Sequence, residues 1–249
     1  MARIDYNEAS RTYDRARGLE LDALDGWRRA VAPWLPAGQP ARILDLGAGT
    51  GQWALAFATW FDAAIVAVEP SAGMRAEGRV KTRGLPVEYV GGAGERLPIR
   101  EQTCDLAWLS TVIHHIPDLD ACARDLRRVV RPGGAALIRS AFPGRTDRIT
   151  LFRYFPEAAR VVDSFPSVER TRVSFEGAGF GFEALQPVPQ VSARDLAAYR
   201  ARVQHRSADT VLRLMDDDVY ARGVARIEAD IAAGVEGPLV DELDMMVFR

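Results

Sequence analysis

The chain has little of several features that would assign it to other classes of protein. It has only two cysteines, Cys104 and Cys122, which are too few for a disulfide framework and lie at no metal-ligand spacing. Lysine occurs once, as Lys81, and the formal net charge of −2 gives no general attraction for nucleic acid or anionic lipid. No apolar run is long enough to span a membrane, and the N-terminus has no hydrophobic targeting core. These absences predict a cytoplasmic protein that binds neither nucleic acid nor membrane.

What remains is an ordinary globular composition, with 48% apolar and 27% charged residues. Short apolar runs alternate with segments of helical pattern, an order typical of a parallel sheet covered by helices on both faces. We therefore expect an α/β fold, doubly wound around a seven-stranded, mostly parallel sheet, with an antiparallel last strand. The predicted strands are 42–46, 64–68, 87–90, 105–109, 135–138, 179–185 and 242–248, and the main helical segments are 52–58, 71–79, 118–130, 168–177 and 193–233.

The chain is organised around the turn that follows the first predicted strand. This strand is apolar except for Asp45, and Gly47, Gly49 and Gly51 follow it at alternate positions before a helix begins. Such a turn brings the backbone close to a ligand and directs free N–H groups at it. Glu69 follows the next apolar run, about where doubly wound folds place the acid that holds ribose hydroxyls. The pattern predicts a nucleoside site, and a tight turn without a ligand is the alternative.

The glycine spacing decides between two nucleoside cofactors. The dinucleotide fingerprint is G-x-G-x-x-G, but Gln52 stands where its third glycine belongs, so the spacing here is G-x-G-x-G. Residues 45–51 (Asp-Leu-Gly-Ala-Gly-Thr-Gly), with Glu69 after the second strand, resemble motif I of class I S-adenosylmethionine-dependent methyltransferases. The resemblance covers about residues 42–140, and the run Arg-Pro-Gly-Gly before the fifth strand is similar to quinone-biosynthesis enzymes. It implies a Rossmann-like class I methyltransferase fold with S-adenosylmethionine as cofactor.

The same resemblance implies the other cofactor contacts. Residues 91–98 resemble the segment G-D-A-E-x-L-P that lies along the adenine, although Ala93 replaces the usual acid and Gly94 the usual alanine. Tyr13 and Arg17 resemble a Y-D-x-x-R lid that closes over cofactor and substrate, and a surface helix with i,i+4 charge pairs explains them equally well. The expected cofactor contacts are Tyr13, Arg17, Asp45, Gly47, Ala48, Gly49, Gly51, Glu69, Pro70, Met74, Ala93, Gly94, Glu95 and Ser110.

The end of the fourth predicted strand indicates the substrate class. Enzymes that methylate the amino group of a base carry an Asn/Asp-Pro-Pro-aromatic tetrad there, and this chain instead continues from Ser110 to His114 and His115. Catechol-type enzymes need acids after the fourth and fifth strands to hold a divalent cation. Ser110, Arg139 and Ser140 stand at those places, so we predict no metal site and a small-molecule substrate.

His114 and His115 are the candidate catalytic residues, together with Tyr13 from the lid. Methyl transfer requires the acceptor to be held in line with the sulfonium methyl, and a base when that acceptor must lose a proton. Both histidines begin the turn at the carboxyl edge of the sheet, and histidine accepts protons near neutral pH. Successive residues of a helix point about 100° apart, so we expect only one of them, His114, to face the pocket. A structural role for both is the alternative.

These observations predict one methyltransferase domain, with N-terminal lid helices at 1–40, a cofactor-binding core at 41–140, and a helical substrate cap at 141–165 and 190–232. Aromatic residues in the first cap segment suit an apolar acceptor, and they suit ordinary packing equally well. We expect a methyl group to be transferred to an O, N or C atom of a small molecule, in specialised metabolism, by a monomer or homodimer. A cyclase or pericyclase that retains S-adenosylmethionine is the alternative, because the fold does not determine the reaction.

Overall fold

The computed structural model describes residues 19–206 and 209–249, and within them one seven-stranded sheet has the strand order β3-β2-β1-β4-β5-β7-β6. The first five strands in this order, β3, β2, β1, β4 and β5, are parallel to their neighbours, and β7 runs antiparallel to both β5 and β6. The doubly wound sheet with an antiparallel last strand is thereby confirmed. The strands are β1 (Arg42–Leu46), β2 (Ala64–Val68), β3 (Val87–Val90), β4 (Cys104–Ser110), β5 (Val130–Ser140), β6 (Phe182–Ala193) and β7 (Leu239–Phe248).

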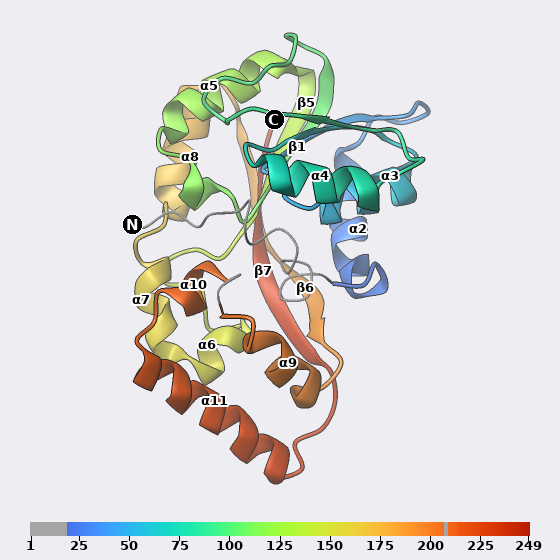
Figure 1. Ribbon diagram of the computed structural model, residues 1–249. Helices are drawn as coiled ribbons and strands as arrows, with labels where there is room; N and C mark the ends of the chain where they lie inside the picture. Colours follow the sequence, from blue (N-terminus) through green and yellow to red (C-terminus); the bar gives the residue numbers. More distant parts are fainter. Residues whose placement is uncertain (1–18, 207–208) are drawn as a thin grey trace.

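Helices cover both faces of the sheet because alternate strand residues point to opposite sides. Ile43 of β1 faces a core with α2 (Asp25–Val31) and α3 (Gln52–Phe61). Leu44 and Leu46 of the same strand face a second core with α5 (Leu119–Val129) and α8 (Val168–Gly177). Figure 1 shows these layers around the upper part of the sheet. The remaining helix of this part is α4 (Ala72–Lys81), and Ser71 is its N-cap as predicted.

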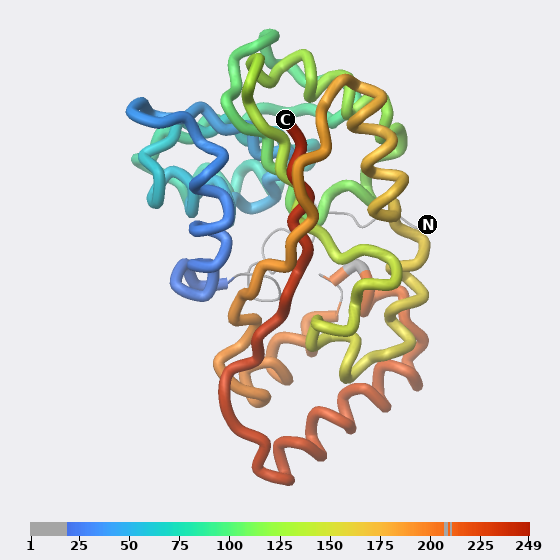
Figure 2. Tube along the Cα trace, turned by 180° about the vertical axis from the view of Figure 1, so that it is seen from behind, coloured from blue at the N-terminus to red at the C-terminus, as the bar shows by residue number. Residues whose placement is uncertain are grey.

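The last two strands continue beyond the rest of the sheet. β5 pairs with β7 only over Asp244–Phe248, whereas β6 pairs with β7 as far as Leu239. Residues 188–193 and 239–243 therefore form a two-stranded ribbon, which reaches down to a group of helices in Figures 1 and 2. We call this group the cap; its elements are α6 (Thr150–Tyr154), η4 (Pro156–Ala158), α7 (Ala159–Val162), α9 (Leu196–Val203), α10 (Thr210–Arg213) and α11 (Asp217–Ala232).

The predicted N-terminal helical pattern is only partly described. Its last part forms η1 (Asp22–Leu24), α2 and η2 (Ala32–Trp34), and Leu24, Trp27 and Val31 are fully buried. Residues 1–18, which include the predicted lid residues, lie outside the described part. In the described ranges, no helix is both long enough and apolar enough to cross a membrane.

The sixth strand was placed incorrectly by the sequence pattern. It begins at Phe182 and ends at Ala193, whereas the prediction ended it before Pro187 and Pro189. Proline is tolerated here because β6 is the outermost strand, where a missing N–H breaks no ladder hydrogen bond. The helical prediction for 193–233 is also too continuous, since three separate helices occupy it in the described residues. Residues 190–193, assigned to the cap from the sequence, belong to this strand.

Candidate functional site

The glycine turn after β1 has the backbone that its sequence predicts. Gly47, Gly49 and Gly51 all have positive φ, at 73°, 54° and 84°, where a side chain is strained. A Cβ atom at Gly47 would overlap Val112, and one at Gly51 would overlap Tyr89, so these two glycines are also required for packing. A Cβ atom at Gly49 would meet no atom within 4 Å. The turn is therefore open on one side only at its middle glycine.

The N–H groups of this turn are not free, contrary to the prediction. The amides of Gly47 and Ala48 donate to the carbonyl of Val68, at 2.8 and 3.2 Å. Gly51 donates to the Ala48 carbonyl at 2.9 Å, and Gly49 donates to Glu69 Oε2 at 3.0 Å. The turn lies against the end of β2, so the protein itself satisfies these donors. The turn therefore leaves room for a ligand, but the N–H groups of these four residues are already used within the protein.

Glu69 holds the turn in place. Its Oε2 accepts the Gly49 amide and its Oε1 accepts the Ser71 amide at 2.9 Å. Burial raises the pKa of Glu69, and these two amide hydrogen bonds lower it in part. A carboxylate has about four acceptor positions, so Glu69 can bind ribose hydroxyls while it still holds the turn.

Asp45 is a buried carboxyl group beside Glu69. Its Oδ2 accepts no hydrogen bond from any residue that the structure describes. Burial, and secondarily the negative charge of Glu69, raises the pKa of Asp45 to about 8, while the amide of Ala54 acts in the opposite direction. A buried acceptor without a partner, at the end of β1 just before the glycine turn, is what a bound polar ligand would complete. These residues therefore fit the methionine end of S-adenosylmethionine.

The predicted adenine loop follows β3 along the same edge. Gly94 packs so closely on Cys122 that an added Cβ atom would lie 2.9 Å from its sulfur. Arg75 donates to the carbonyls of Glu69 and Pro70 at 2.7 and 2.9 Å. Ala93 pairs with Arg96 in an isolated bridge. The loop is thus fixed beside the ends of β1 and β2.

A cavity of about 240 Å³ joins the glycine turn to the cap. Of the expected site residues, it brings together Gly47, Ala48, Gly49, Ser110, His114 and His115. Asp45, Gly51, Glu69, Pro70, Met74, Ala93, Gly94 and Glu95 are not in its lining. Tyr13 and Arg17 lie outside the described residues, so the predicted lid is not tested.

Both predicted histidines line the cavity, although we expected only one to do so. They lie in η3 (Ile113–His115), a short 3-10 turn rather than an α-helix, and their ring centroids are 4.1 Å apart. The His114 ring stacks on Phe165, with centroids 3.9 Å apart and planes 6° apart. His205 also lines the cavity, so all three histidines of the chain lie around it.

Comparison with known proteins agrees with this geometry. A family model described as a methyltransferase domain matches residues 44–138. The demethylmenaquinone methyltransferase of Streptomyces avermitilis is 32% identical over 168 residues, which cover 65% of this chain and 71% of that enzyme. The chain belongs to the class I S-adenosylmethionine-dependent methyltransferases.

Two further matches are a second demethylmenaquinone methyltransferase and a solved structure. The demethylmenaquinone methyltransferase of Streptomyces griseus is 35% identical over 146 residues, which cover 56% of this chain and 62% of that enzyme. A structure from Anabaena variabilis, assigned as a methyltransferase of an antibiotic biosynthesis pathway, superimposes with a TM-score of 0.71 at 21% identity. That match covers 88% of this chain and 96% of the Anabaena chain, and it shows a shared fold.

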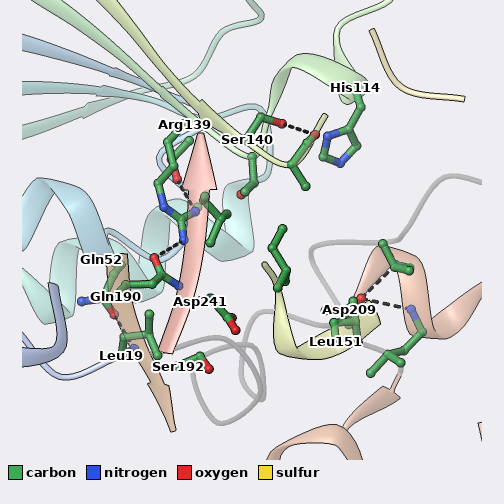
Figure 3. Close-up of a pocket in the computed structure, with 18 of the residues that line it drawn as sticks. Leu19, Gln52, His114, Arg139, Ser140, Leu151, Gln190, Ser192, Asp209 and Asp241 are labelled. Atoms are coloured by element: carbon green, nitrogen blue, oxygen red, sulfur yellow. Dashed lines mark hydrogen bonds between the residues drawn. The ribbon is translucent and has the colours of Figure 1, made fainter. Parts of the chain in front are cut away.

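In this methyltransferase, the cavity wall also contains Arg139, surrounded by partners that the sequence did not reveal. Arg139, at the end of β5, donates to Ser110 Oγ at 3.1 Å and to Gln190 Oε1 at 2.6 Å, as Figure 3 shows for Gln190. Its guanidinium carbon lies 5.1 and 5.4 Å from the ring centroids of Trp27 and Trp53. The partners come from α2, α3, β4 and β6. No local motif could have joined residues so far apart in the chain.

Proposed function

We propose that the chain transfers a methyl group from S-adenosylmethionine to an O, N or C atom of a small molecule bound beneath the cap. The observation that carries this proposal is the cavity, because one continuous space touches both the glycine turn and the cap helices. A donor at the turn and an acceptor under the cap would share that space. Holding the two reactants in one geometry supplies most of what methyl transfer needs.

The cofactor would be held at the edge of the sheet formed by β1, β2 and the loop after β3. Glu69 would accept the ribose hydroxyls, and Asp45 would accept a polar hydrogen from the methionine end. The loop around Gly94 would lie along the adenine, without the acidic side chain that Ala93 replaces. When bound, S-adenosylmethionine supplies an electrophilic methyl group on sulfur.

The acceptor would be handled by residues of the cavity. His114 would take a proton from an acceptor that carries one, with Tyr13 closing over the site. Arg139 lies on the cavity wall beside Ser110, and a permanently charged guanidinium favours an acceptor that becomes negative as it loses its proton. We further propose that the protein acts in the cytoplasm, in specialised metabolism, as a monomer or homodimer.

Titration calorimetry tests the cofactor. We expect binding of S-adenosylmethionine and S-adenosylhomocysteine in preference to NAD, and about 10- to 100-fold weaker binding in Glu69→Ala because hydrogen bonds to a charged group are lost. Glu88→Ala is the control, since Glu88 is an exposed residue of β3. A preference for NAD, or equal affinity in Glu69→Ala, contradicts the proposal.

Transfer from methyl-labelled cofactor to a cell extract tests the reaction. We expect the label in a small molecule. Label found only in tRNA or protein contradicts the substrate class. A substrate that is converted without gaining label, while the cofactor stays intact, favours a cyclase or pericyclase.

A further inference from the structure

The inner face of the ribbon carries polar side chains where a packed antiparallel pair ordinarily carries apolar ones. Gln190, Ser192 and Asp241 are only 6%, 3% and 6% exposed, yet all three line the cavity. Gln190 and Asp241 are direct partners in the register of β6 and β7, so their side chains share one face of the ribbon. Burying polar side chains costs free energy of folding unless each polar group forms a hydrogen bond. A function in ligand binding would explain it.

The hydrogen bonds already made fix the orientation of Gln190. Its Oε1 accepts from Trp27 Nε1 at 2.9 Å and from Arg139 Nη2 at 2.6 Å. With the oxygen occupied by two donors, the amide nitrogen of Gln190 points away from Arg139 and toward the cavity, as Figure 3 shows. Gln190 therefore offers N–H donors to a ligand.

Asp241 and Tyr199 complement this donor. Asp241 Oδ1 accepts the amide of Thr150 at 2.8 Å, which leaves the lone pairs of its second oxygen available in the cavity. The hydroxyl of Tyr199 is buried in the cavity lining and has no hydrogen-bond partner among the described residues. A buried hydroxyl without a partner is uncommon and calls for an explanation such as a ligand.

Apolar side chains also line the cavity, together with Arg202, His205 and Asp209. The apolar side chains come from the cap helices and from the residues just after α7, and they are Leu151, Phe152, Val162, Phe165, Val203 and Leu212. A ligand between them and the ribbon would have an apolar body and one polar edge. Cβ atoms of direct cross-strand partners are about 4.5–5.5 Å apart, so groups from Gln190 and Asp241 reach neighbouring atoms of that edge.

We propose that Gln190, Asp241 and Tyr199 form the acceptor-recognition site, and that the acceptor is a small apolar ring with a hydrogen-bond donor next to a carbonyl oxygen. Gln190 donates to the carbonyl oxygen, and Asp241 accepts from the neighbouring O–H or N–H group. Tyr199 donates to the carbonyl oxygen from the other side. The inference rests on the methyl transfer proposed above.

Three ring compounds serve as probes, titrated calorimetrically into the full chain saturated with S-adenosylhomocysteine. 2-Quinolinone has an N–H next to its carbonyl, 1-methyl-2-quinolinone lacks the N–H, and indole has an N–H but no carbonyl. We expect 2-quinolinone to bind at least tenfold more tightly than either analogue. Equal affinities, or no binding of 2-quinolinone at millimolar concentration, overturn the inference.

Two near-isosteric variants assign the preference to its residues. Asp241→Asn keeps an oxygen for the Thr150 amide and turns a donor toward the cavity, so the preference over 1-methyl-2-quinolinone should fall to within twofold. Gln190→Glu keeps an oxygen for Trp27 and Arg139 and removes the donor, so the preference over indole should fall likewise. The matched controls are Glu242→Gln, next to Asp241 on β7, and Gln186→Glu on β6, neither of which lines the cavity. Unchanged preferences in Asp241→Asn and Gln190→Glu overturn the assignment.

Tyr199→Phe separates recognition from structure. Removing a hydroxyl that has no partner should raise the melting temperature of the ligand-free protein, while weakening 2-quinolinone binding severalfold. A lower melting temperature with unchanged affinity means that Tyr199 is structural and contradicts its role. Cofactor titrations on the same proteins keep the two proposals apart. Loss of cofactor binding in the wild type refutes methyl transfer, whereas intact cofactor binding without a probe preference refutes only this inference.

Discussion

The cofactor edge and the ribbon, which lie at opposite ends of the candidate site, satisfy their polar groups in different ways. At the cofactor edge, which comprises residues 45–51 and 69–71, the partners are mainly backbone groups: Glu69 accepts two amides, and the turn donates to a strand carbonyl. At the ribbon, the partners are side chains from distant elements, as in the contacts of Gln190 with Trp27 and Arg139. Each region also has one buried oxygen without a partner among the described residues: Asp45 Oδ2 at the cofactor edge, and the hydroxyl of Tyr199 on α9 near the ribbon.

This difference indicates what each end is built to do. Backbone partners remain when side chains change, so the cofactor edge keeps its shape before any ligand arrives. The ribbon depends on individual side chains, and a change of one residue alters what it binds. The first arrangement suits a ligand common to many enzymes of a fold, and the second suits a ligand particular to one.

The largest effect is expected at His114, which lines the cavity. His114→Ala should lower kcat by about 10²–10⁴-fold, because a base that removes the acceptor proton is lost, and should leave cofactor affinity unchanged. Phe165→Leu removes the ring that stacks on His114 and should cost only severalfold. The measurement is kcat across the pH range, with the acceptor that the labelling experiment identifies. If His114→Ala stays within a few-fold of wild type at every pH, the histidine is structural.

A pH-dependent effect is expected at Asp45, whose pKa is raised from 3.8 to about 8. Between these values the folded protein keeps a proton that the unfolded chain has released. Folding stability should therefore decrease as pH rises through this window, by up to about 1.4 kcal/mol per pH unit. Asp45→Asn cannot lose this proton, so its advantage over wild type should grow from pH 5 to pH 8 in urea unfolding. Asp62→Asn, at an exposed position, is the control; parallel curves for Asp45→Asn and wild type would exclude the effect.

The smallest effect is expected at the N-cap serines of two helices, α4 and α8. Ser71 caps α4 by accepting the Met74 amide, and Ser167 caps α8 by accepting the Arg170 amide. Either serine-to-alanine change should cost about 1 kcal/mol of stability. Only Ser71→Ala should also weaken cofactor binding, by severalfold, because alanine keeps the amide that holds Glu69 but loses the side-chain cap that fixes this amide at the start of α4. Unfolding curves and calorimetry on both variants check this, and an equal change of cofactor affinity in the two would remove the distinction.

The cofactor edge was largely predictable from the sequence because its signals are local. The strands 42–46, 64–68 and 87–90, the cap at Ser71 and the helix 168–177 all agree with the structure. Each depends on residues a few positions apart. The free N–H groups were predicted wrongly because the carbonyl that accepts two of them belongs to β2, at Val68.

The ribbon was not predictable in the same way. Judged from the local sequence alone, Pro187 and Pro189 should end the strand. They are tolerated only because β6 lies at the edge of the sheet. Gln190 and Asp241 become partners through strand pairing across 51 positions of sequence. Arg139 was noticed only as evidence against a metal site. Its role depends on aromatic rings from two other elements.

The two prolines also bear on how copies of this protein behave in a crowded solution. An outermost strand offers unpaired N–H groups to any other extended chain, which is how sheets join edge to edge into aggregates. Pro187 and Pro189 have no N–H, and the Pro189 carbonyl lies against Gly26 of α2. A further strand would find neither donors at these two positions nor space beside the second. The ribbon can therefore extend far from the sheet without recruiting a neighbouring molecule.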